Sequence, residues 1–380
     1  MFDYIVQPND TIYSITRLFG ITTAVLLLAN PELQSQGITI GQTLRIPQGE
    51  LVRSVIEVNG YAPVTVDPEE LRNALPYLTY LSILSYDIRA DGTLPPVNDT
   101  WLIEAARQKG VEPLMVITNI DPNIDPVAGF SAELAHILLF DERIRRSMIN
   151  NIVATLQQKS YSGVNVNFTE VYPSDYFSLA EFMRALTMRL HPLGLLLVVA
   201  PSISILIKQQ DALTEANLHI PINSVVDRLI LRTAQWVCTY EYSETSHIDQ
   251  LQQAIDFIIR YVSSRKILLS IPGCCYDFRL GAGNNELYSI LSSAKADALV
   301  QQTGAVFRID PRSRTSHFTY FGDDGMFHEV LCQSDTNLRA PLDIVRAYNL
   351  GGLSFRTIED FSVASYQMVT SRFEIRNAFR

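Results

Sequence analysis

The feature that most limits the fold is a repeated alternation of short apolar stretches with amphipathic stretches, which runs from about Ser54 to the end of the chain. Such alternation is typical of parallel β/α architecture, because parallel strands are joined by crossover helices. The apolar stretches lie at residues 55–61, 79–85, 112–118, 163–169, 194–200, 228–234, 267–272 and 351–356. This pattern predicts an α/β fold, specifically a (β/α)8 TIM barrel.

The spacing between the last two predicted strands is longer than elsewhere. Within it, residues 318–321 and 327–330 have strand-like composition, and the glycine-rich residues 322–325 between them predict a turn. We therefore expect a small α+β insertion at about 277–335, within a barrel domain that spans residues 52–380.

A separate small unit precedes the barrel. Residues 4–6 and 43–47 read as strands, and between them lie two short amphipathic stretches that predict helices. Asp10 or Thr11 is placed to cap the first helix, and Asn30-Pro31 ends the second. The prediction is a β-α-α-β domain at residues 1–48, joined to the barrel by the short linker 48–50.

This unit closely resembles a LysM module. The resemblance rests on Tyr4-x-Val6-x-x-x-Asp10-Thr11, on Asn30-Pro31, and on Gly41-Gln42-x-Leu44-x-Ile46-Pro47. It implies binding of N-acetylglucosamine-containing polymers, either peptidoglycan or chitin, in a groove between the loop after the first strand and the loop after the second helix. The candidate glycan-binding residues are Asn9, Asp10, Thr11, Ile12, Ala29, Asn30 and Pro31, of which Asp10 and Asn30 are also expected to serve as cap and turn residues.

The most informative barrel strand is the stretch 161–171. Asn165, Asn167 and Thr169 alternate with apolar residues, so these three polar side chains fall on one face of the strand. A row of polar side chains inside a barrel is costly unless something uses or satisfies it. The stretch is therefore a candidate site.

The same stretch is similar to the fourth barrel strand of glycoside hydrolase family 18, the chitinase-like family. There the pattern is Asp-Gly-x-Asn/Asp-x-Asp-Phe-Glu, and the final Glu is the general acid. Further resemblances lie at residues 56–61, 85–94, 271–277 and 351–354. Together with the LysM-first layout, they resemble spore peptidoglycan (cortex-fragment) N-acetylglucosaminidases. That subgroup implies synthesis in the mother-cell cytoplasm without a signal peptide and a place on the spore coat or cell wall.

The residues that the family uses for catalysis are replaced in this sequence. Family 18 chemistry needs a protonated Glu, an Asp that orients the substrate acetamide, a Tyr that binds it and a Trp under the sugar. The resemblance aligns these positions with Thr169, Asn167, Ala234 and Arg356, respectively. A hydroxyl cannot replace a tuned carboxyl as general acid. We therefore expect no catalytic residues and interpret the chain as a glycan-binding pseudoenzyme.

Two alternatives stay open. In one, a bulge at the strand end turns Glu170 inward, and the chain is an active N-acetylglucosaminidase of family 18 type. In the other, the chain is a self-assembling structural subunit, associated with itself or with other coat proteins, that binds no glycan. We expect Glu170 to be solvated, because neighbouring strand residues point to opposite faces.

Two arrangements of the barrel cleft are also open. In the first, the position that the sugar occupies in family 18 enzymes is filled by Arg356, Arg232 and Gln235, which pair with Asp87 or Asp277. In the second, the cleft keeps Asn165 together with aromatic platforms for a glycan, namely Tyr61, Tyr86, Trp236 and Phe355.

Composition excludes several classes of partner. The formal net charge is −10, and no basic block offsets it, so we expect neither nucleic acid nor a membrane surface as partner. No signal peptide or membrane-length apolar run is expected. Cys238, Cys274, Cys275 and Cys332 match no zinc spacing and are expected to be buried free thiols. No metal or other cofactor is predicted.

Overall fold

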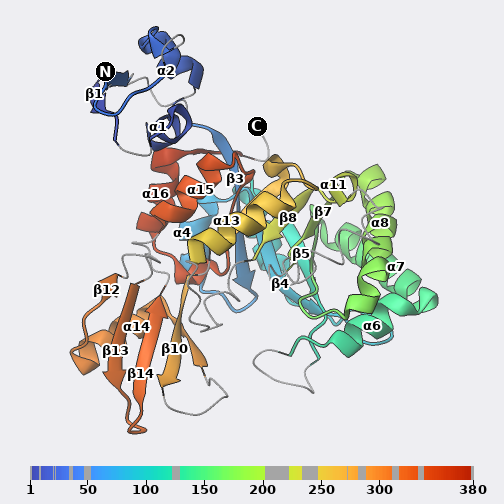
Figure 1. The fold of residues 1–380 in the computed structure, drawn as a ribbon. Coiled ribbons are helices and arrows are strands. Elements are labelled where there is room, and N and C mark those ends of the chain that lie inside the picture. Colours follow the sequence, from blue (N-terminus) through green and yellow to red (C-terminus); the bar gives the residue numbers. More distant parts are fainter. Residues whose placement is uncertain are drawn as a thin grey trace.

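A computed structural model gives the structure of the protein. It describes residues 2–7, 10–19, 21, 23–33, 37–46, 53–121, 129–201, 222–232, 247–271, 273–280, 288–309, 316–332 and 338–377. Figure 1 shows a small N-terminal unit, a central barrel surrounded by helices, and a second sheet formed by a later part of the chain. Among the described residues, no helix is long and apolar enough to cross a membrane.

The N-terminal unit is the predicted β-α-α-β arrangement. It consists of β1 (Phe2–Ile5), α1 (Ile12–Phe19), α2 (Thr23–Ala29) and β2 (Thr43–Ile46). The two strands pair antiparallel, with Phe2 opposite Ile46. The helices close over this pair and enclose a small apolar core, which contains Val6, Ile15, Leu26, Leu33, Leu44 and Ile46.

The central domain is a closed barrel of eight parallel strands, as predicted. The strands are β3 (Val55–Pro63), β4 (Tyr80–Asp87), β5 (Glu112–Thr118), β6 (Gly163–Asn167), β7 (Leu196–Val199), β8 (Arg228–Leu231), β9 (Ile267–Ile271) and β15 (Gly352–Phe355). Each pairs with the next along the chain, and β15 pairs with β3 to close the barrel. A short strand, β16 (Glu374–Ile375), adds to β3 from outside.

Amphipathic helices cover the outside of the barrel (Figure 1). They are α4 (Pro68–Ala74), α5 (Thr100–Gln108), α6 (Ala132–Phe140), α7 (Glu142–Lys159), α8 (Tyr176–Leu190), α11 (Ile222–Val225), α13 (His247–Ile258), α15 (Arg339–Ala347) and α16 (Val363–Arg372). Several begin at a capping side chain: Asp67 accepts from the backbone N–H groups of Glu69 and Glu70, and Asp141 from that of Arg143.

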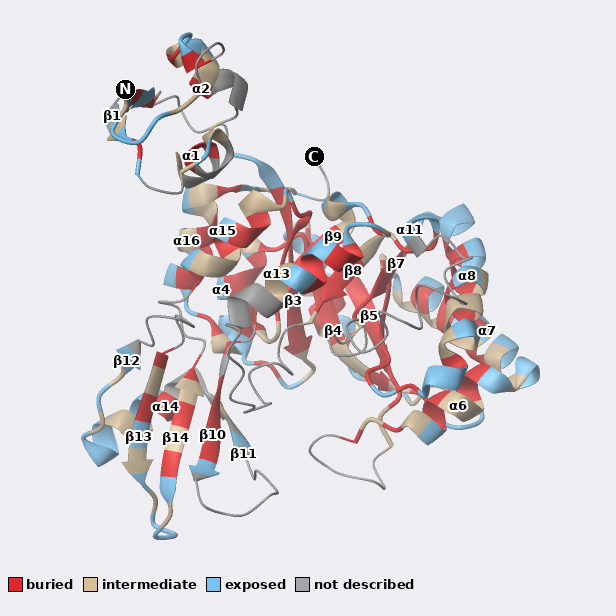
Figure 2. Cartoon of the chain, viewed as in Figure 1, coloured by how far each residue is buried: buried red, intermediate tan, exposed pale blue. Residues whose placement is uncertain are grey.

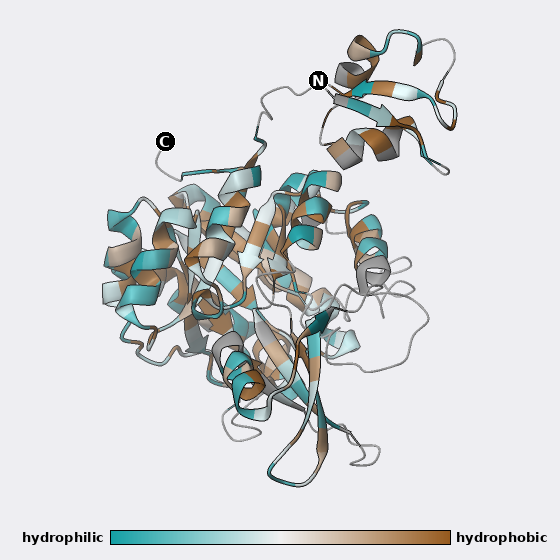
Figure 3. Cartoon of the chain, turned by 90° about the vertical axis from the view of Figure 1, so that its left-hand side faces the viewer, coloured by the Kyte–Doolittle hydropathy of each residue, from teal (hydrophilic) through white to brown (hydrophobic). Residues whose placement is uncertain are grey.

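The core lies on both faces of the barrel strands. Buried residues concentrate in the strands and on the inner faces of the helices, whereas exposed residues lie on the outer helix faces (Figure 2). Figure 3 shows the same division by hydropathy, with hydrophobic residues along the central strands. Inside the barrel a separate apolar cluster is formed by Tyr61, Tyr80, Leu114, Val116, Val198, Ala200, Ile230 and Leu268.

The long segment between β9 and β15 forms a second, antiparallel sheet in spatial order β11-β10-β14-β13-β12. Its strands are β10 (Cys274–Leu280), β11 (Tyr288–Ser292), β12 (Arg308–Ile309), β13 (Ser316–Phe321) and β14 (Phe327–Cys332). Helix α14 (Ser293–Thr303) packs against this sheet. The turn at Gly322–Gly325 lies between β13 and β14, so the predicted strand-turn-strand is present.

The prediction of free thiols is wrong for two of the cysteines. Cys275 and Cys332 form a disulfide, because the antiparallel register of β10 and β14 places them directly opposite each other. They are 57 residues apart in sequence, so their proximity depends on the sheet and not on a local spacing motif. Cys274 pairs in register with Ser292 of β11, and Cys238 lies outside the described residues.

Candidate functional site

A chain of hydrogen-bonded polar side chains crosses the barrel interior. Asn59 of β3 donates to the Ser354 hydroxyl of β15 at 2.9 Å and accepts from the Ser82 hydroxyl of β4 at 2.7 Å. Asn165 of β6 then donates to Ser82 at 3.1 Å and to the Tyr61 hydroxyl at 2.8 Å. The inward-facing polar residues of four different strands therefore satisfy one another, which offsets the cost of burying them.

Two groups in this series of hydrogen-bonded side chains show how strongly the barrel interior is shielded from solvent. Burial raises the pKa of Tyr61 to about 12, although the hydrogen bond from Asn165 acts in the opposite direction. The side-chain oxygen Oδ1 of Asn165 is buried without a hydrogen-bond donor among the described residues. The Asn165 amide therefore keeps an unused acceptor inside the barrel.

An arginine that follows β8 lies at the carboxyl end of β6. Arg232, immediately after β8, donates from Nη1 to Asn167 Oδ1 at 2.7 Å and to Thr169 Oγ1 at 2.6 Å. Its guanidinium carbon lies 6.0 Å from the centre of the Phe130 ring, which is within cation–π range. The guanidinium is thus fixed against the two residues that the sequence aligns with the orienting Asp and the acid Glu.

The electrostatic setting of Arg232 is unusual for a cation. Burial lowers the pKa of its guanidinium, and the positive charge of Arg356 acts in the same direction. Among the residues that the structure describes, no carboxylate forms an ion pair with Arg232. Nη1 has both its donors engaged, whereas Nε and Nη2 have no hydrogen-bond partner in the described part of the chain.

Glu170, the fallback acid, is exposed. Asn119 holds the backbone on either side of it: Asn119 Nδ2 donates to the Glu170 carbonyl at 2.7 Å, and Asn119 Oδ1 accepts from the Thr169 N–H at 3.2 Å. Thr169 is buried. The strand end therefore places Thr169 inside and Glu170 outside, as the alternation of strand residues predicts.

Two of the predicted aromatic platforms lie outside this group. Tyr86 is buried among the residues packed outside the barrel strands, and its hydroxyl donates to Asp99 at 2.6 Å. Asp99 also pairs with Lys159 at 2.6 Å. Phe355 is fully buried against Phe361, with ring centres 4.5 Å apart. Gln235, Trp236 and Ala234 lie outside the described residues.

The two carboxylates considered as arginine partners are engaged elsewhere. Asp87 accepts from the hydroxyls of Ser85 and Thr118, at 2.9 and 2.6 Å. Asp277 lies in the second sheet, where it accepts from the Tyr320 hydroxyl at 2.8 Å and contacts His328 Nδ1 at 2.8 Å. The predicted arginine at the strand ends is therefore present as Arg232, whose described hydrogen bonds go to Asn167 and Thr169.

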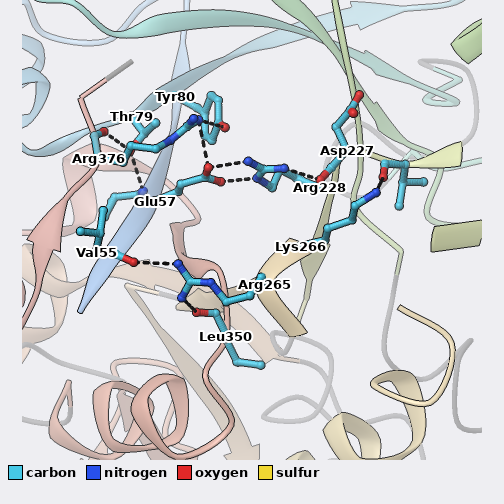
Figure 4. A network of polar contacts seen from close by, with 12 residues as sticks. Val55, Glu57, Thr79, Tyr80, Asp227, Arg228, Arg265, Lys266, Leu350 and Arg376 are labelled. Carbon is cyan, nitrogen blue, oxygen red and sulfur yellow. Dashed lines mark hydrogen bonds and ion pairs between the residues drawn. The ribbon is translucent and has the colours of Figure 1, made fainter. Parts of the chain in front are cut away.

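The amino end of the barrel carries a different ionic network (Figure 4). Glu57 of β3 binds the guanidinium of Arg228 with both carboxylate oxygens and forms a second ion pair with Arg376 at 2.9 Å. Arg376 also donates to the Tyr80 hydroxyl at 2.6 Å. Burial alone would lower the pKa of Arg228, but Glu57, together with Tyr80 and Asp227, acts in the opposite direction and the pKa is raised.

In the N-terminal unit, the predicted glycan-binding residues divide into two kinds. Asn30 is buried: its amide donates to the carbonyls of Leu26 and Arg45 and accepts from the Arg45 N–H at 2.7 Å, which ties α2 to β2. Asp10 accepts from the Tyr4 hydroxyl at 2.7 Å. Thr11 and Pro31 are exposed, Ile12 and Ala29 are half-buried, and Asn9 lies outside the described residues.

Sequence reasoning missed three residues that shape the barrel site: Ser82, Asn119 and Phe130. Ser82 lies in a strand that was correctly predicted, and its alternation in that strand could have marked it as inward-facing. Asn119 and Phe130 follow β5 in a connecting segment, where no periodic pattern indicates direction. Among the described residues, no group of His, Cys, Asp and Glu side chains is arranged to hold a metal ion.

These features define the class of protein. Residues 4–47 match the family model of the LysM domain, and the rest of the described chain is dominated by a closed (β/α)8 barrel with a polar interior at its centre. The chain therefore combines a LysM domain with a closed (β/α)8 barrel.

The particular relatives are enzymes of bacterial spores and chitin breakdown. The cortical fragment-lytic enzyme of Bacillus anthracis is 26% identical over 342 residues, which is 87% of this chain and 77% of that enzyme. The crystal structure of the Bacillus cereus spore cortex-lytic enzyme SleL has a TM-score of 0.76 at 23% identity, with 100% of this chain and 88% of that chain covered. A chitinase from Chromobacterium violaceum has a TM-score of 0.69 at 21% identity, covering 83% and 98%, respectively. At such identities the solved structures show a shared fold.

Proposed function

We propose that this protein binds peptidoglycan without cleaving it and serves as a non-catalytic component of the spore coat or cell wall. One observation carries the proposal: the Arg232 guanidinium is hydrogen-bonded to both Asn167 and Thr169. The place where a family 18 enzyme would need a protonated carboxyl and an orienting carboxylate is held by two neutral side chains and a cation.

This arrangement opposes glycoside hydrolysis on chemical grounds. The general acid must be a group that holds a proton near neutral pH and releases it to the leaving oxygen, and the Thr169 hydroxyl cannot do so. A carboxyl usually gains that property by burial in an apolar site, as in the tuned acids of known glycosidases. Glu170 is exposed, so it lacks the surroundings that would make it such an acid.

Glycan attachment is assigned to the LysM domain. LysM homology and the cortex-lytic and chitinase relatives support an N-acetylglucosamine-containing polymer as the ligand, and the cortex-lytic names favour peptidoglycan over chitin. Exposed Thr11 and Pro31, with half-buried Ile12, are the residues that we propose contact the polymer. Asn30 supports them by fixing the end of α2.

The proposed spore or wall location is supported by the relatives, whose names refer to the spore cortex. The Cys275–Cys332 disulfide agrees with a final position outside a reducing cytosol, where disulfides are rare. Both observations support a final position at the spore surface or cell wall.

The test is to incubate the full chain with spore-cortex peptidoglycan, pellet the polymer, and analyse the supernatant by mass spectrometry. We expect the protein in the pellet and no N-acetylglucosamine-ended fragments. Fragments that vanish with Glu170→Ala would overturn the proposal and make Glu170 the acid. A protein that stays in the supernatant, and forms concentration-dependent oligomers instead, would favour the structural-subunit alternative.

Two variants test whether the proposed LysM loops bind the polymer. Pro31→Arg places a bulky charge in the proposed binding loop, and we expect it to weaken pelleting. Ser147→Arg introduces the same side chain at an exposed position of α7 in the barrel domain, and should leave pelleting unchanged. Equal effects of the two variants would contradict the assigned binding loops.

A further inference from the structure

The carboxyl end of the barrel holds a cation whose hydrogen-bonding capacity is only partly used. A guanidinium has five N–H donors. Two of those of Arg232, both on Nη1, reach Asn167 and Thr169. The Nε–H and the Nη2 donors form the opposite edge, and they have no partner among the described residues. That edge is the geometry that receives a carboxylate through two parallel hydrogen bonds.

The orientation of this edge is fixed before any ligand arrives. The two bonds from Nη1 hold one side of the guanidinium, and the Phe130 ring lies against it, with 6.0 Å between guanidinium carbon and ring centre. Pre-organisation of this kind reduces the entropy lost on binding. Arg232 is half-buried, so the guanidinium remains in contact with solvent.

Charge makes an anion the favoured ligand. Burial and the positive charge of Arg356 both lower the pKa of Arg232, which means that the local environment disfavours the cation as it stands. An incoming anion would relieve both effects. The protein as a whole carries a net charge of −10, so long polyanions are repelled and a small ligand with one anionic group is favoured.

The surroundings indicate what carries the anion. Amide and hydroxyl side chains, Asn167 and Thr169, lie directly beside the guanidinium, and an aromatic ring faces it. Amides, hydroxyls and rings are the groups that contact sugars. We propose that this end of the barrel binds a carboxylate-bearing N-acetylated saccharide, with the carboxylate on the Nε/Nη2 edge of Arg232. The peptidoglycan sugar with this chemistry is N-acetylmuramic acid without an attached stem peptide, because its lactyl group then carries a free carboxylate.

This inference deepens the proposed function and rests on it, since it assigns the altered barrel a saccharide ligand of its own. It differs from a neutral N-acetylglucosamine site in requiring a charge on the ligand. It also separates the roles of the two domains, because the LysM domain recognises the N-acetylglucosamine polymer and the barrel recognises the acidic sugar.

The experiment is isothermal titration calorimetry of the full chain with three probes. They are the disaccharide of N-acetylglucosamine and N-acetylmuramic acid, the methyl ester of that disaccharide, and neutral N,N′-diacetylchitobiose. We expect the free acid to bind about tenfold or more tightly than the ester, which is the usual value of a charge-assisted hydrogen bond. LysM binding contributes alike to the acid and its ester, so their ratio isolates the carboxylate.

Matched variants locate the effect. Arg232→Gln should abolish the preference for the acid over the ester, and Arg232→Lys should retain only part of it, because lysine lacks the planar fork. Arg146→Gln makes the same change at an exposed position of α7 and should leave the ratio unchanged. If Arg232→Gln fails to fold, the wild-type ratio still decides the question.

The overturning results are equally specific. Equal binding of acid and ester by the wild type, or a preference that survives Arg232→Gln, would refute the site. Equal competition by sodium acetate or inorganic phosphate alone would refute the saccharide assignment. If the protein pellets with peptidoglycan, releases no fragments, and binds the acid and the ester equally, this inference is refuted and the proposed function stands. Fragment release that Glu170→Ala abolishes refutes the proposed function whatever the ratio.

Discussion

Each end of the barrel holds a half-buried arginine, but the two ends treat its charge in opposite ways. At the amino end, the Glu57 carboxylate binds Arg228 and Arg376, and the pKa of Arg228 is raised. At the carboxyl end, Arg232 is held by the neutral Asn167 and Thr169, and its pKa is lowered. Glu57 compensates the arginines of the amino end, whereas at the carboxyl end no carboxylate forms an ion pair with Arg232 among the described residues, although the charge of Glu170 acts to raise its pKa.

This difference matches the usual roles of the two ends of this fold. In TIM barrels, the amino end supports stability and the carboxyl end carries function. A closed ion network suits the first purpose, because each buried charge has a partner. An arginine with an unused donor edge suits the second, because it is costly to keep without a ligand. The comparison therefore teaches that the two ends differ in how their arginines are compensated among the described residues.

The largest expected effect tests the amino end. Glu57→Gln removes the carboxylate that compensates Arg228 and Arg376 and leaves both half-buried cations without it. The free energy of unfolding should fall by about 3–5 kcal/mol, measured by denaturant unfolding. A loss below about 1 kcal/mol, the range of an exposed pair, would show that the network is only a surface feature.

A smaller effect of opposite sign is expected at the carboxyl end. Asn167→Asp gives Arg232 a carboxylate at nearly constant volume, and should raise the free energy of unfolding by about 1 kcal/mol at neutral pH. A carboxylate beside an arginine has a depressed pKa in the folded state. The gain should therefore persist above about pH 4 and disappear as the pH falls further. No gain at neutral pH would mean that Arg232 already has a countercharge.

The smallest effect concerns the polar chain between the two ends. Tyr61→Phe removes one hydroxyl and should cost about 1 kcal/mol at neutral pH. Since burial raises the pKa of Tyr61 to about 12, its contribution is fully present below about pH 10 and is lost as pH rises from about 10 to about 12. The wild type should accordingly lose stability faster than the variant in that range, as followed by alkaline unfolding. Parallel curves would show that Tyr61 ionises normally.

Much of the fold was predictable from the sequence, because it depends on local patterns. The period of the apolar residues located all eight barrel strands, and the cap and turn residues located the LysM helices. The buried face of β6 was also predictable, since Asn165, Asn167 and Thr169 alternate along one strand.

The site itself was less predictable, because its contacts join distant parts of the chain. Arg232 lies 65 residues from Asn167 in sequence, and its direction is set by how β8 follows β6 around the barrel. The Cys275–Cys332 disulfide depends on sheet register in the same way. Tyr86 shows the reverse problem: its motif resembled a cleft residue, but its hydroxyl is drawn to buried Asp99 on the other side of the strand.

The measurement that tests the central claim most directly is the change in free energy of unfolding for Arg228→Gln and Arg232→Gln, compared under identical conditions without ligand. Removing Arg228 breaks a buried ion pair and should cost about 3 kcal/mol or more. Arg232 is a half-buried cation with no ion-pair partner among the described residues, so its removal should leave stability within about 1 kcal/mol of the wild type or raise it. Equal losses for the two variants would contradict the account, because they would show that both ends are closed in the same way.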